Sequence, residues 1–481
     1  MSTTSLALAR SRRTPLASAV AALFALSAPA AYATTFVTNC NDSGAGSLRA
    51  GVSSAVEGDT VDASGLTSAS PGCGFSRITL STGAINVTKN SLTIKGPGPS
   101  VMAVTAKYNN NAGTTNQYFS RIFNHTGTGT FEVDDMSVTK GYLKPASGDA
   151  LGGCIYSKAA VKLVNVNVTG CTAKAVSTLA RGGGVYAKTS AYLALTNFTF
   201  NVTNSGTGTG SYGGALFTPG SLIAKYSAFE INRATNTAHT NGITGGVDAR
   251  GTLALIHNVT IANNQSDGNI GGLTVTNPGA SITLINSTIS GNTAPNALAG
   301  GAYLSGDDIA LYNTTIANNT AKLAAVSLSP GLTISSAGAT RTLRLESNLI
   351  ANNSYGASAT QNDISIVGSP TTTGANNLVR TPSGSVPGDT IVGKCPLLKA
   401  LADNGGPTRT HSFYGHSPAI DAGNNAFGST SDQRGHPPNN GDTVSYPRLS
   451  GPPGSTAVAD IGAFELNQTE EIFDSAFEGC P

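Results

Sequence analysis

The sequence predicts an all-β protein, a right-handed parallel β-helix, and three observations lead to this class. A short unit recurs six times between residues 152 and 319, the interior of each unit is strand-like, and the composition suits many tight coils. Repeats with a fixed period of about 20 to 50 residues are typical of solenoids, in which each unit packs on its neighbours. Apolar residues at helical spacing are absent from these units.

Each repeated unit opens with a glycine pair and closes with a large apolar residue followed three positions later by Asn or Cys. From first glycine to closing apolar residue the distance is 16 in five units and 18 in the sixth, while the units recur every 26 to 32 residues. Geometry therefore fixes the first part, and the variable part forms loops. The pairs begin at Gly152, Gly182, Gly213, Gly245, Gly271 and Gly300, and the closing residues are Val168/Cys171, Phe198/Asn201, Phe229/Asn232, Ile261/Asn264, Ile289/Asn292 and Ile316/Asn319.

The segments inside the units read as short strands. Residues 253–256 and 282–285 are aliphatic or β-branched and are bounded by Gly, Asn, Asp or Ser. In a parallel β-helix, equivalent residues stack about 4.8 Å apart and fill a continuous interior. The expected interior columns are Ile256, Leu284 and Leu311, and Ile261, Ile289 and Ile316.

The closing asparagines and the glycine pairs suit the corners of such a coil. Asn tolerates left-handed backbone, and its amide can bond to equivalent residues in the coils above and below. Glycine suits the other corner, where a side chain would collide with the next coil. The repeated residues are therefore expected to be structural.

The composition excludes several functional classes. Charged residues make up 11% of the chain, against about 25% in ordinary soluble domains. The formal net charge of +2 gives no basis for nucleic-acid binding. The chain has 58 Gly, no Trp and three Met, which suits tight coils better than a compact mixed α/β enzyme.

The chain before the coils has two parts. Basic residues at Arg10, Arg12 and Arg13, an apolar run over residues 16–28 and a small-residue site predict a signal peptide cleaved after Ala33, on the general secretory route. Residues 47–56 predict a helix that plugs the open end of the first coil. Its expected cap is Ser47, and its expected apolar face is Leu48, Val52 and Val56, with Arg49 and Asp59 as an ion pair.

The composition changes again after the coils, from Cys395 onward, into turns with a few charges between them. This block is expected to cover the last coil, through a network of Arg434, Arg448, Asp460 and Glu465. The predicted domains are a signal peptide (1–33), an amino-terminal cap with the first coils (34–100), β-helix repeats (101–394), a carboxyl-terminal capping module (395–467) and a tail (468–481).

Two family resemblances follow from these motifs. The glycine pairs and the closing apolar-x-x-Asn motifs resemble the repeats of polymorphic outer-membrane proteins and related bacterial right-handed β-helix proteins. The motifs at residues 401–408, 417–423, 432–435 and 460–465 resemble the terminal module of the choice-of-anchor family of secreted bacterial proteins. The resemblances imply an exported solenoid at the outer-membrane surface of a Gram-negative bacterium or beyond it, and they imply no particular reaction.

Six cysteines in an exported chain favour disulfides over metal binding. Six cysteines allow fifteen connectivities, so the pairing suggested by spacing is a hypothesis. There is no Cys-x-x-Cys motif and no His-rich cluster, so we expect no zinc site and no cofactor. The expected pairs are Cys40 with Cys73, Cys154 with Cys171, and Cys395 with Cys480.

Three acidic positions are candidates for chemistry, because pectin lyases and polygalacturonases share this architecture and use clustered carboxylates. Asp307 and Asp308 resemble the double-Asp motif of polygalacturonases, but the family's partner motifs are missing from this chain. Asp134 with Asp135 is a second acidic pair, and Asp248 with Arg250 is a lone neighbour pair. Acids at corners beside glycine are usually solvated turn residues.

The favoured function is a non-catalytic, secreted or surface-exposed scaffold of adhesin type, and we expect a monomer of about a dozen coils. Its loops, such as residues 206–210 and 235–241, would present binding sites to a glycan or to a host or cell surface. The alternative is a polysaccharide lyase or glycoside hydrolase of the pectin-degrading type.

Overall fold

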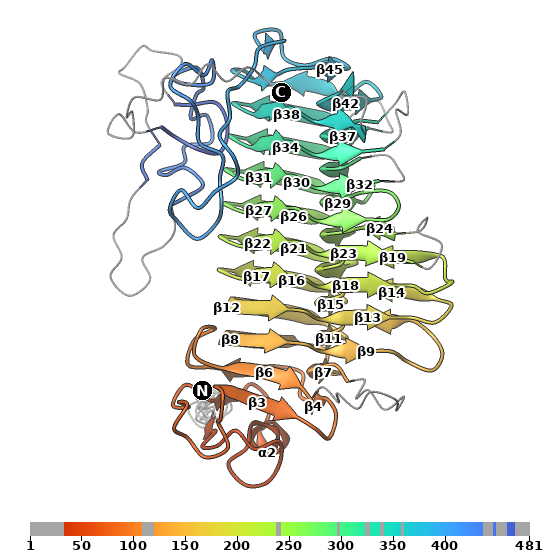
Figure 1. Ribbon diagram of the computed structural model, residues 1–481, viewed down its shortest axis with the longest axis vertical. Helices are drawn as coiled ribbons and strands as arrows, with labels where there is room; N and C mark the ends of the chain where they lie inside the picture. The colour runs from red at the N-terminus through yellow and green to blue at the C-terminus, as the bar shows by residue number, and fades with distance from the viewer. Residues whose placement is uncertain are drawn as a thin grey trace, which may run out of the picture.

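The computed structural model describes residues 33–107, 120–236, 242–295, 299–322, 328–336, 341–356, 360–435, 446–448 and 459–466. It is a nearly all-β parallel solenoid of about 10 turns with a single short helix, so the predicted fold class is confirmed. Figure 1 shows the coils stacked along the long axis, with the carboxyl-terminal segment, drawn in blue, along one side. In the described part of the chain, no helix combines the length and apolar character needed to cross a membrane.

The coils pass through three sheets, A, B and C, and four coils add a strand of a fourth, sheet D. Sheet A has 22 strands and contains two strand positions per coil, which are joined in β8 and β12. Its strands are β1 (Thr34–Phe36), β2 (Thr60–Asp62), β3 (Arg77–Leu80), β5 (Leu92–Lys95), β6 (Ala103–Ala106), β8 (Thr130–Thr139), β12 (Ala160–Thr169), β16 (Ser190–Ala194), β17 (Asn197–Thr199), β21 (Ser221–Lys225), β22 (Ala228–Glu230), β26 (Leu253–His257), β27 (Thr260–Ala262), β30 (Ser281–Ile285), β31 (Thr288–Ser290), β34 (Asp308–Tyr312), β35 (Thr315–Ala317), β38 (Thr342–Glu346), β39 (Leu349–Ala351), β43 (Thr371–Thr373), β44 (Leu378–Val379) and β46 (Ile391–Val392).

Sheet B has 11 strands, sheet C has 9 and sheet D has 4. The first and last coils lack strands of sheets C and D, and the solenoid has about 10 turns where the sequence predicts about a dozen. Sheet B contains β4 (Ile85–Val87), β7 (Phe123–His125), β11 (Ile155–Ser157), β15 (Val185–Ala187), β20 (Leu216–Thr218), β25 (Val247–Ala249), β29 (Leu273–Thr276), β33 (Ala302–Ser305), β37 (Leu332–Ser335), β42 (Ile364–Val367) and β45 (Pro382–Ser383). Sheet C contains β9 (Tyr142–Leu143), β13 (Thr172–Lys174), β18 (Val202–Asn204), β23 (Arg233–Thr235), β28 (Gln265–Ser266), β32 (Thr293–Ala294), β36 (Thr320–Ala321), β40 (Ser354–Tyr355) and β41 (Thr360–Gln361). Sheet D contains β10 (Ala150–Leu151), β14 (Leu179–Arg181), β19 (Gly210–Tyr212) and β24 (Gly242–Thr244).

The predicted interior columns are confirmed by the strand register. Ile261 pairs with Ile289 and Ile289 with Ile316 in neighbouring coils, and all three side chains are buried. The second predicted column, through Leu284, is aligned in the same way. Stacked apolar side chains therefore fill one continuous core along the solenoid.

At the closing corner, we expected one Asn both to take the left-handed backbone and to bond to its neighbours in adjacent coils. In the structure, two consecutive residues perform these two roles. The residue before the closing Asn takes the left-handed backbone, with φ of 57° at Phe200 and Ile231 and 54° at Asn263. The closing Asn is buried, and in six coils it forms an asparagine ladder in which each Nδ2 donates to the next Oδ1 at 2.9 Å. The ladder residues are Asn201, Asn232, Asn264, Asn292, Asn319 and Asn353.

The glycine pairs have the expected steric role. A Cβ on Gly183 would lie 2.2 Å from the carbonyl oxygen of Gly214 in the next coil. The first glycine of that pair, Gly182, has φ of 64°, a conformation that side chains disfavour. Both members of the pair therefore require glycine, one for conformation and one for space.

The amino-terminal helix α2 (Leu48–Ser54) is confirmed, with Ser47 accepting a hydrogen bond from the backbone N–H of Ala50. Two details differ from the prediction. The helix ends before Val56, so that side chain is exposed and does not belong to the apolar face. Arg49 pairs with Asp42 at 2.7 Å and not with Asp59, because Asp59 instead accepts backbone N–H groups beside the helix.

Two of the three predicted disulfides are present, Cys40–Cys73 and Cys154–Cys171. The third expected pair includes Cys480, which lies outside the described residues, as do the signal peptide through residue 32 and the tail. The two disulfides fit an oxidising, extracellular environment.

The carboxyl-terminal module, meaning the described residues from Cys395 onward, lies along the flank of the solenoid and not only over its last coil. At the corner between the two halves of sheet A, three buried asparagines donate Nδ2 hydrogen bonds to backbone carbonyls of the module. These corner asparagines are Asn258 to Gln433 (3.1 Å), Asn286 to Ser431 (2.9 Å) and Asn313 to Asn424 (3.2 Å). The module contacts several coils because each of these coils has an asparagine at this corner whose amide donates to the module.

The module has its own apolar and ionic interior. Its apolar cluster joins Leu349 and Leu378 of sheet A to Phe413 and Phe464. The four residues predicted for its network are buried. The network bonds are Arg434 to Asp432 (2.7 Å), Arg434 to the Glu465 carbonyl (2.6 Å), Arg448 to Glu465 (3.2 Å) and Arg448 to the Asp460 carbonyl (3.2 Å).

Replacing Ile231 with asparagine is expected to stabilise the protein by about 1 to 2 kcal/mol, because a β-branched residue in left-handed backbone is strained by that amount. Ile231 is exposed, and the equivalent residue in the next coil is Asn263. The matched reverse change, Asn263→Ile, should lower the urea midpoint by a similar amount. Equal midpoints for Ile231→Asn and the unmodified protein would contradict the prediction.

Candidate functional site

The outward face of the first half of sheet A presents a row of aromatic side chains, which we call the aromatic strip. Successive residues of a strand point to opposite faces, so alternate positions of β16, β26 and β34 face outward, and Tyr226 directly follows β21 at the corner. The strip consists of Tyr192, Tyr226, His257, Tyr312 and, from the carboxyl-terminal module, Phe427.

The rings of the strip form a chain of contacts that crosses coils. Tyr226 lies 6.1 Å from His257, His257 lies 6.2 Å from Phe427, and Phe427 lies 5.2 Å from Tyr312, measured between ring centroids. Arg344 of β38 extends the row, with its guanidinium 5.6 Å from the Tyr312 ring. The rings are tilted or edge-on to one another, so their faces are not closed off by parallel stacking.

The residues of the strip differ in exposure. Tyr192 is 36% exposed and Phe427 is 44% exposed. Burial, followed by the charge of Lys225, lowers the pKa of His257 to about 4, so the imidazole is neutral at physiological pH. Burial raises the pKa of Tyr226, and so does nearby Tyr192. The strip is therefore an uncharged aromatic surface.

Below the strip, three ionisable side chains of β8 and β12 form what we call the acid–lysine cluster. Lys162 contacts Glu132 at 2.5 Å. Asp134 lies two residues after Glu132 on the same face of β8, and burial, followed by the charge of Glu132, raises the pKa of Asp134 to about 7. One oxygen of Asp134 is buried without a hydrogen-bond partner. At neutral pH, Asp134 is therefore partly protonated.

The structure separates the predicted acidic positions. Asp135 points away from this cluster to a corner, where Asn165 donates to it at 2.8 Å. Asp307 is exposed and pairs with Arg341 at 3.0 Å, while Asp308 accepts a hydrogen bond from Thr342. These carboxylates serve the coil corners and do not converge with the acid–lysine cluster.

The third predicted position lies on another sheet. Asp248 is buried in β25 of sheet B, and its carboxylate pairs with Arg250 at 2.8 Å. Thr244 also donates to Asp248 at 3.1 Å. Across the described ranges, no three His, Cys, Asp or Glu side chains are grouped so as to hold a metal ion.

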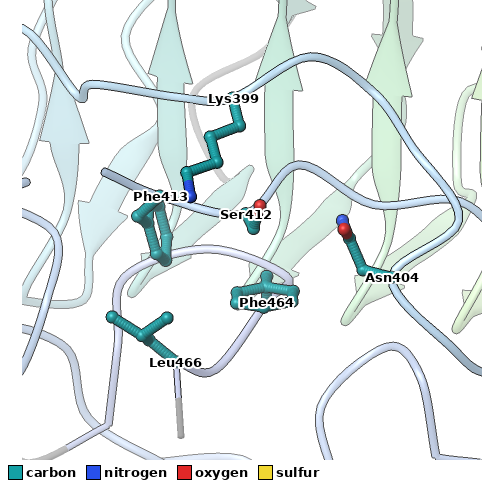
Figure 2. A pocket seen from close by; sticks show the side chains of 6 residues that line it. All are labelled: Lys399, Asn404, Ser412, Phe413, Phe464 and Leu466. Atoms are coloured by element: carbon teal, nitrogen blue, oxygen red, sulfur yellow. The ribbon is translucent and has the colours of Figure 1, made fainter. Parts of the chain in front are cut away.

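A small pocket of about 210 Å³ lies within the carboxyl-terminal module. Figure 2 shows its polar side chains in the upper part of the view and Phe464 and Leu466 in the lower part. The volume is below the roughly 300 Å³ of small-molecule sites, so we assign no ligand to it. The pocket is lined by Lys399, Asn404, Ser412, Phe413, Phe464 and Leu466.

The aromatic strip was not among the sites predicted from the sequence. Tyr192 and Tyr312 are 120 residues apart in the chain, and Phe427 comes from a different part of it. One part of the strip could have been noticed in the sequence, because Tyr312 is the last residue of the strand that begins at the candidate acid Asp308. Sequence alone, however, did not place the carboxyl-terminal module beside sheet A.

Comparison with protein-family models, with curated proteins and with solved structures found no match to this chain. The fold and the site therefore define its class directly. It is a parallel β-solenoid with a carboxyl-terminal module on its flank and an aromatic strip along one outward face.

Proposed function

We propose that this protein is an exported, non-catalytic scaffold that binds a glycan along the aromatic strip. The supporting observation is the set of rings Tyr192, Tyr226, His257 and Tyr312 on four of five neighbouring coils, completed by Phe427; the coil of β30 has Ile285 at this position. The C–H faces of sugar rings pack on aromatic side chains, while sugar hydroxyls bond to neighbouring polar groups. An elongated row of rings suits a chain of sugars better than it suits a small molecule.

Three further features agree with this proposal. A solenoid in which every coil hydrogen-bonds to the next is rigid, so the rings are held at fixed spacing before a ligand arrives. The two disulfides fit an extracellular environment. The resemblance of the repeats to polymorphic outer-membrane proteins and of the module to the choice-of-anchor family favours display at a bacterial surface.

A glycan array screened with the processed protein tests the proposal, followed by affinity measurements on a glycan that binds. Phe427→Ala and Tyr192→Ala are each expected to weaken binding at least tenfold, because both rings are exposed contact surfaces. The matched control is Phe75→Ala, which removes an 89% exposed ring at the amino-terminal cap. Silence across the array, or equal losses in Phe75→Ala and Phe427→Ala, would contradict the proposal.

A second candidate function is cleavage of a polysaccharide, and the acid–lysine cluster favours it. A carboxyl group that keeps its proton near pH 7 beside a second carboxyl group is suited to general acid–base work. Asp134, with its pKa raised to about 7 by burial and by Glu132, meets that description. It lies on the same sheet as the aromatic strip, where a bound glycan would pass.

Incubation with pectin, alginate or glycosaminoglycan separates the two functions. The scaffold proposal predicts that no unsaturated or reducing ends are released. Activity that falls at least a hundredfold in Asp134→Asn, and that is retained in Asp307→Asn and Asp308→Asn, would replace the scaffold with an enzyme. Those two controls remove acids that the structure places at coil corners.

A further inference from the structure

A second ordered surface lies on the outward face of sheet B, away from the aromatic strip. Tyr156, Tyr186 and Phe217 occupy one register position in β11, β15 and β20. Their ring centroids are 5.5 and 5.7 Å apart, and the rings are nearly parallel, at 12° and 14°. Tyr186 and Phe217 are buried, at 8% and 4% exposure, so the stack supports the side chains around it and is not itself a contact surface for a ligand.

Three arginines lie over this stack. The guanidinium of Arg121 is 4.9 Å from the Tyr156 ring centroid, and those of Arg181 and Arg250 are 5.4 and 5.2 Å from the Phe217 centroid. A guanidinium that lies on an aromatic ring is held in place and still has N–H groups for a carboxylate. We call these six residues the aromatic–arginine column.

Two of the arginines have carboxylate partners and still reach solvent. Arg181 pairs with Asp149 at 3.1 Å, and its side chain is 24% exposed. Arg250 pairs with buried Asp248 at 2.8 Å, and its side chain is 35% exposed. Each partner fixes its arginine in position without covering it.

The remaining cations of this face have no carboxylate partner among the contacts of the described residues. Arg121 donates to the neutral amide oxygen of Asn124 at 2.7 Å. Burial lowers the pKa of Arg121 to about 10, so it stays charged at neutral pH. Lys158 and Lys188 follow paired strand ends in β11 and β15 and are exposed. This face therefore carries five cations, Arg121, Lys158, Arg181, Lys188 and Arg250, and only two carboxylates that pair with them, Asp149 and Asp248.

We propose that the aromatic–arginine column is a second binding site, which takes an acidic polysaccharide running along the solenoid axis. Lys158, Lys188 and Arg250 follow β11, β15 and β25 at one register position, so coils about 4.8 Å apart align these three cations along the solenoid axis. Arg121 and Arg181 contact the ring stack beside this line, and a polymer with regularly spaced carboxylates requires such spacing. Nucleic acid is disfavoured because the formal net charge of the chain is only +2. This site differs from the aromatic strip in its sheet, its charge and the class of glycan that it takes.

The test measures binding of sodium polygalacturonate to the processed protein at low and at high salt. The double variant Arg121→Gln/Arg181→Gln is expected to bind at least tenfold more weakly at low salt, and its salt dependence should be shallower. These changes spare the buried Asp248–Arg250 pair, so the coil keeps its structure. The matched control is Arg77→Gln, whose guanidinium also lies over a ring, 4.9 Å from Phe75, at the amino-terminal cap.

Specificity is tested with neutral dextran and with single-stranded DNA. We expect no binding of dextran at this site and weaker binding of DNA than of polygalacturonate. The proposal is overturned if polygalacturonate does not bind, if the double variant binds within twofold of the unmodified protein, or if DNA binds more tightly. Phe427→Ala should leave polygalacturonate binding unchanged, because Phe427 belongs to the aromatic strip. This variant therefore distinguishes binding at the aromatic–arginine column from binding at the strip.

Discussion

Replacing Arg448 with alanine is expected to cost about 3 to 5 kcal/mol and to release the carboxyl-terminal module from the flank of the solenoid. Arg448 is fully buried and pairs with Glu465 at 3.2 Å. It also donates to the carbonyl oxygens of Asp460 (3.2 Å) and Gly462 (3.0 Å), and to Asn286 of sheet A (3.3 Å). Burial raises the pKa of Glu465, so its carboxylate depends on this arginine for its charge. The change therefore leaves several polar groups buried without partners.

Limited proteolysis and thermal unfolding measure this effect. In Arg448→Ala, cleavage within the module should become fast while the coils stay resistant, because the module is bound through side chains and the coils through strand pairing. The matched control is Arg409→Ala, which removes another arginine between module and solenoid, paired with Glu230 at 2.9 Å but partly exposed. That change should cost less than about 1 kcal/mol. Equal protease sensitivity in the two variants would refute the account.

The coil itself could be predicted because its constraints repeat. Ile289 requires an apolar residue at the same position in the coils above and below it. The position of Gly183 has no room for a side chain beside the next coil, so the same requirements appear in every unit. The pairs Cys40–Cys73 and Cys154–Cys171 followed from spacing within one coil. Constraints that recur in each coil can be seen in a single sequence.

Contacts that break the repeat could not be predicted in this way. Asn258 and Asn263 are both asparagines at corners with positive φ, yet Asn258 is buried beneath the module and Asn263 is exposed. Nothing local distinguishes them, because the partner carbonyl of Gln433 is 175 residues away. The partner of Arg49 was missed for a different reason, since Asp42 is only seven residues away but lies in an irregular loop outside the repeat.

The candidate sites depend on these same non-repeating contacts. Phe427 completes the aromatic strip only because the module lies beside sheet A. Asp248 and Arg250 were visible as neighbours in the sequence, but their place beside Phe217 depends on which residues face outward on sheet B. The sequence thus identified single acids, whereas the surfaces that suit a glycan arise from side chains of several coils.

Replacing Asn292 with alanine is expected to destabilise the solenoid by about 3 to 5 kcal/mol, at roughly 1 kcal/mol for each hydrogen bond lost and more for groups left buried without partners. The Asn292 amide donates to the Ile261 carbonyl (2.8 Å) and to Asn319 (2.9 Å). Its oxygen accepts from the backbone and the side chain of Asn264, at 3.0 and 2.9 Å. The side chain is completely buried, so water cannot replace these bonds.

The control for Asn292→Ala is Asn318→Ala, which removes the same side chain from an exposed corner with φ of 58°. That change should lower the urea midpoint by the equivalent of only about 1 kcal/mol, because left-handed backbone is its main cost. Asn264→Ala and Asn292→Ala both remove the hydrogen bond from Asn264 Nδ2 to Asn292 Oδ1, so the double variant should lose less than the sum of the single losses. Strict additivity, or equal midpoints for Asn292→Ala and Asn318→Ala, would show that the ladder does not act as a connected column.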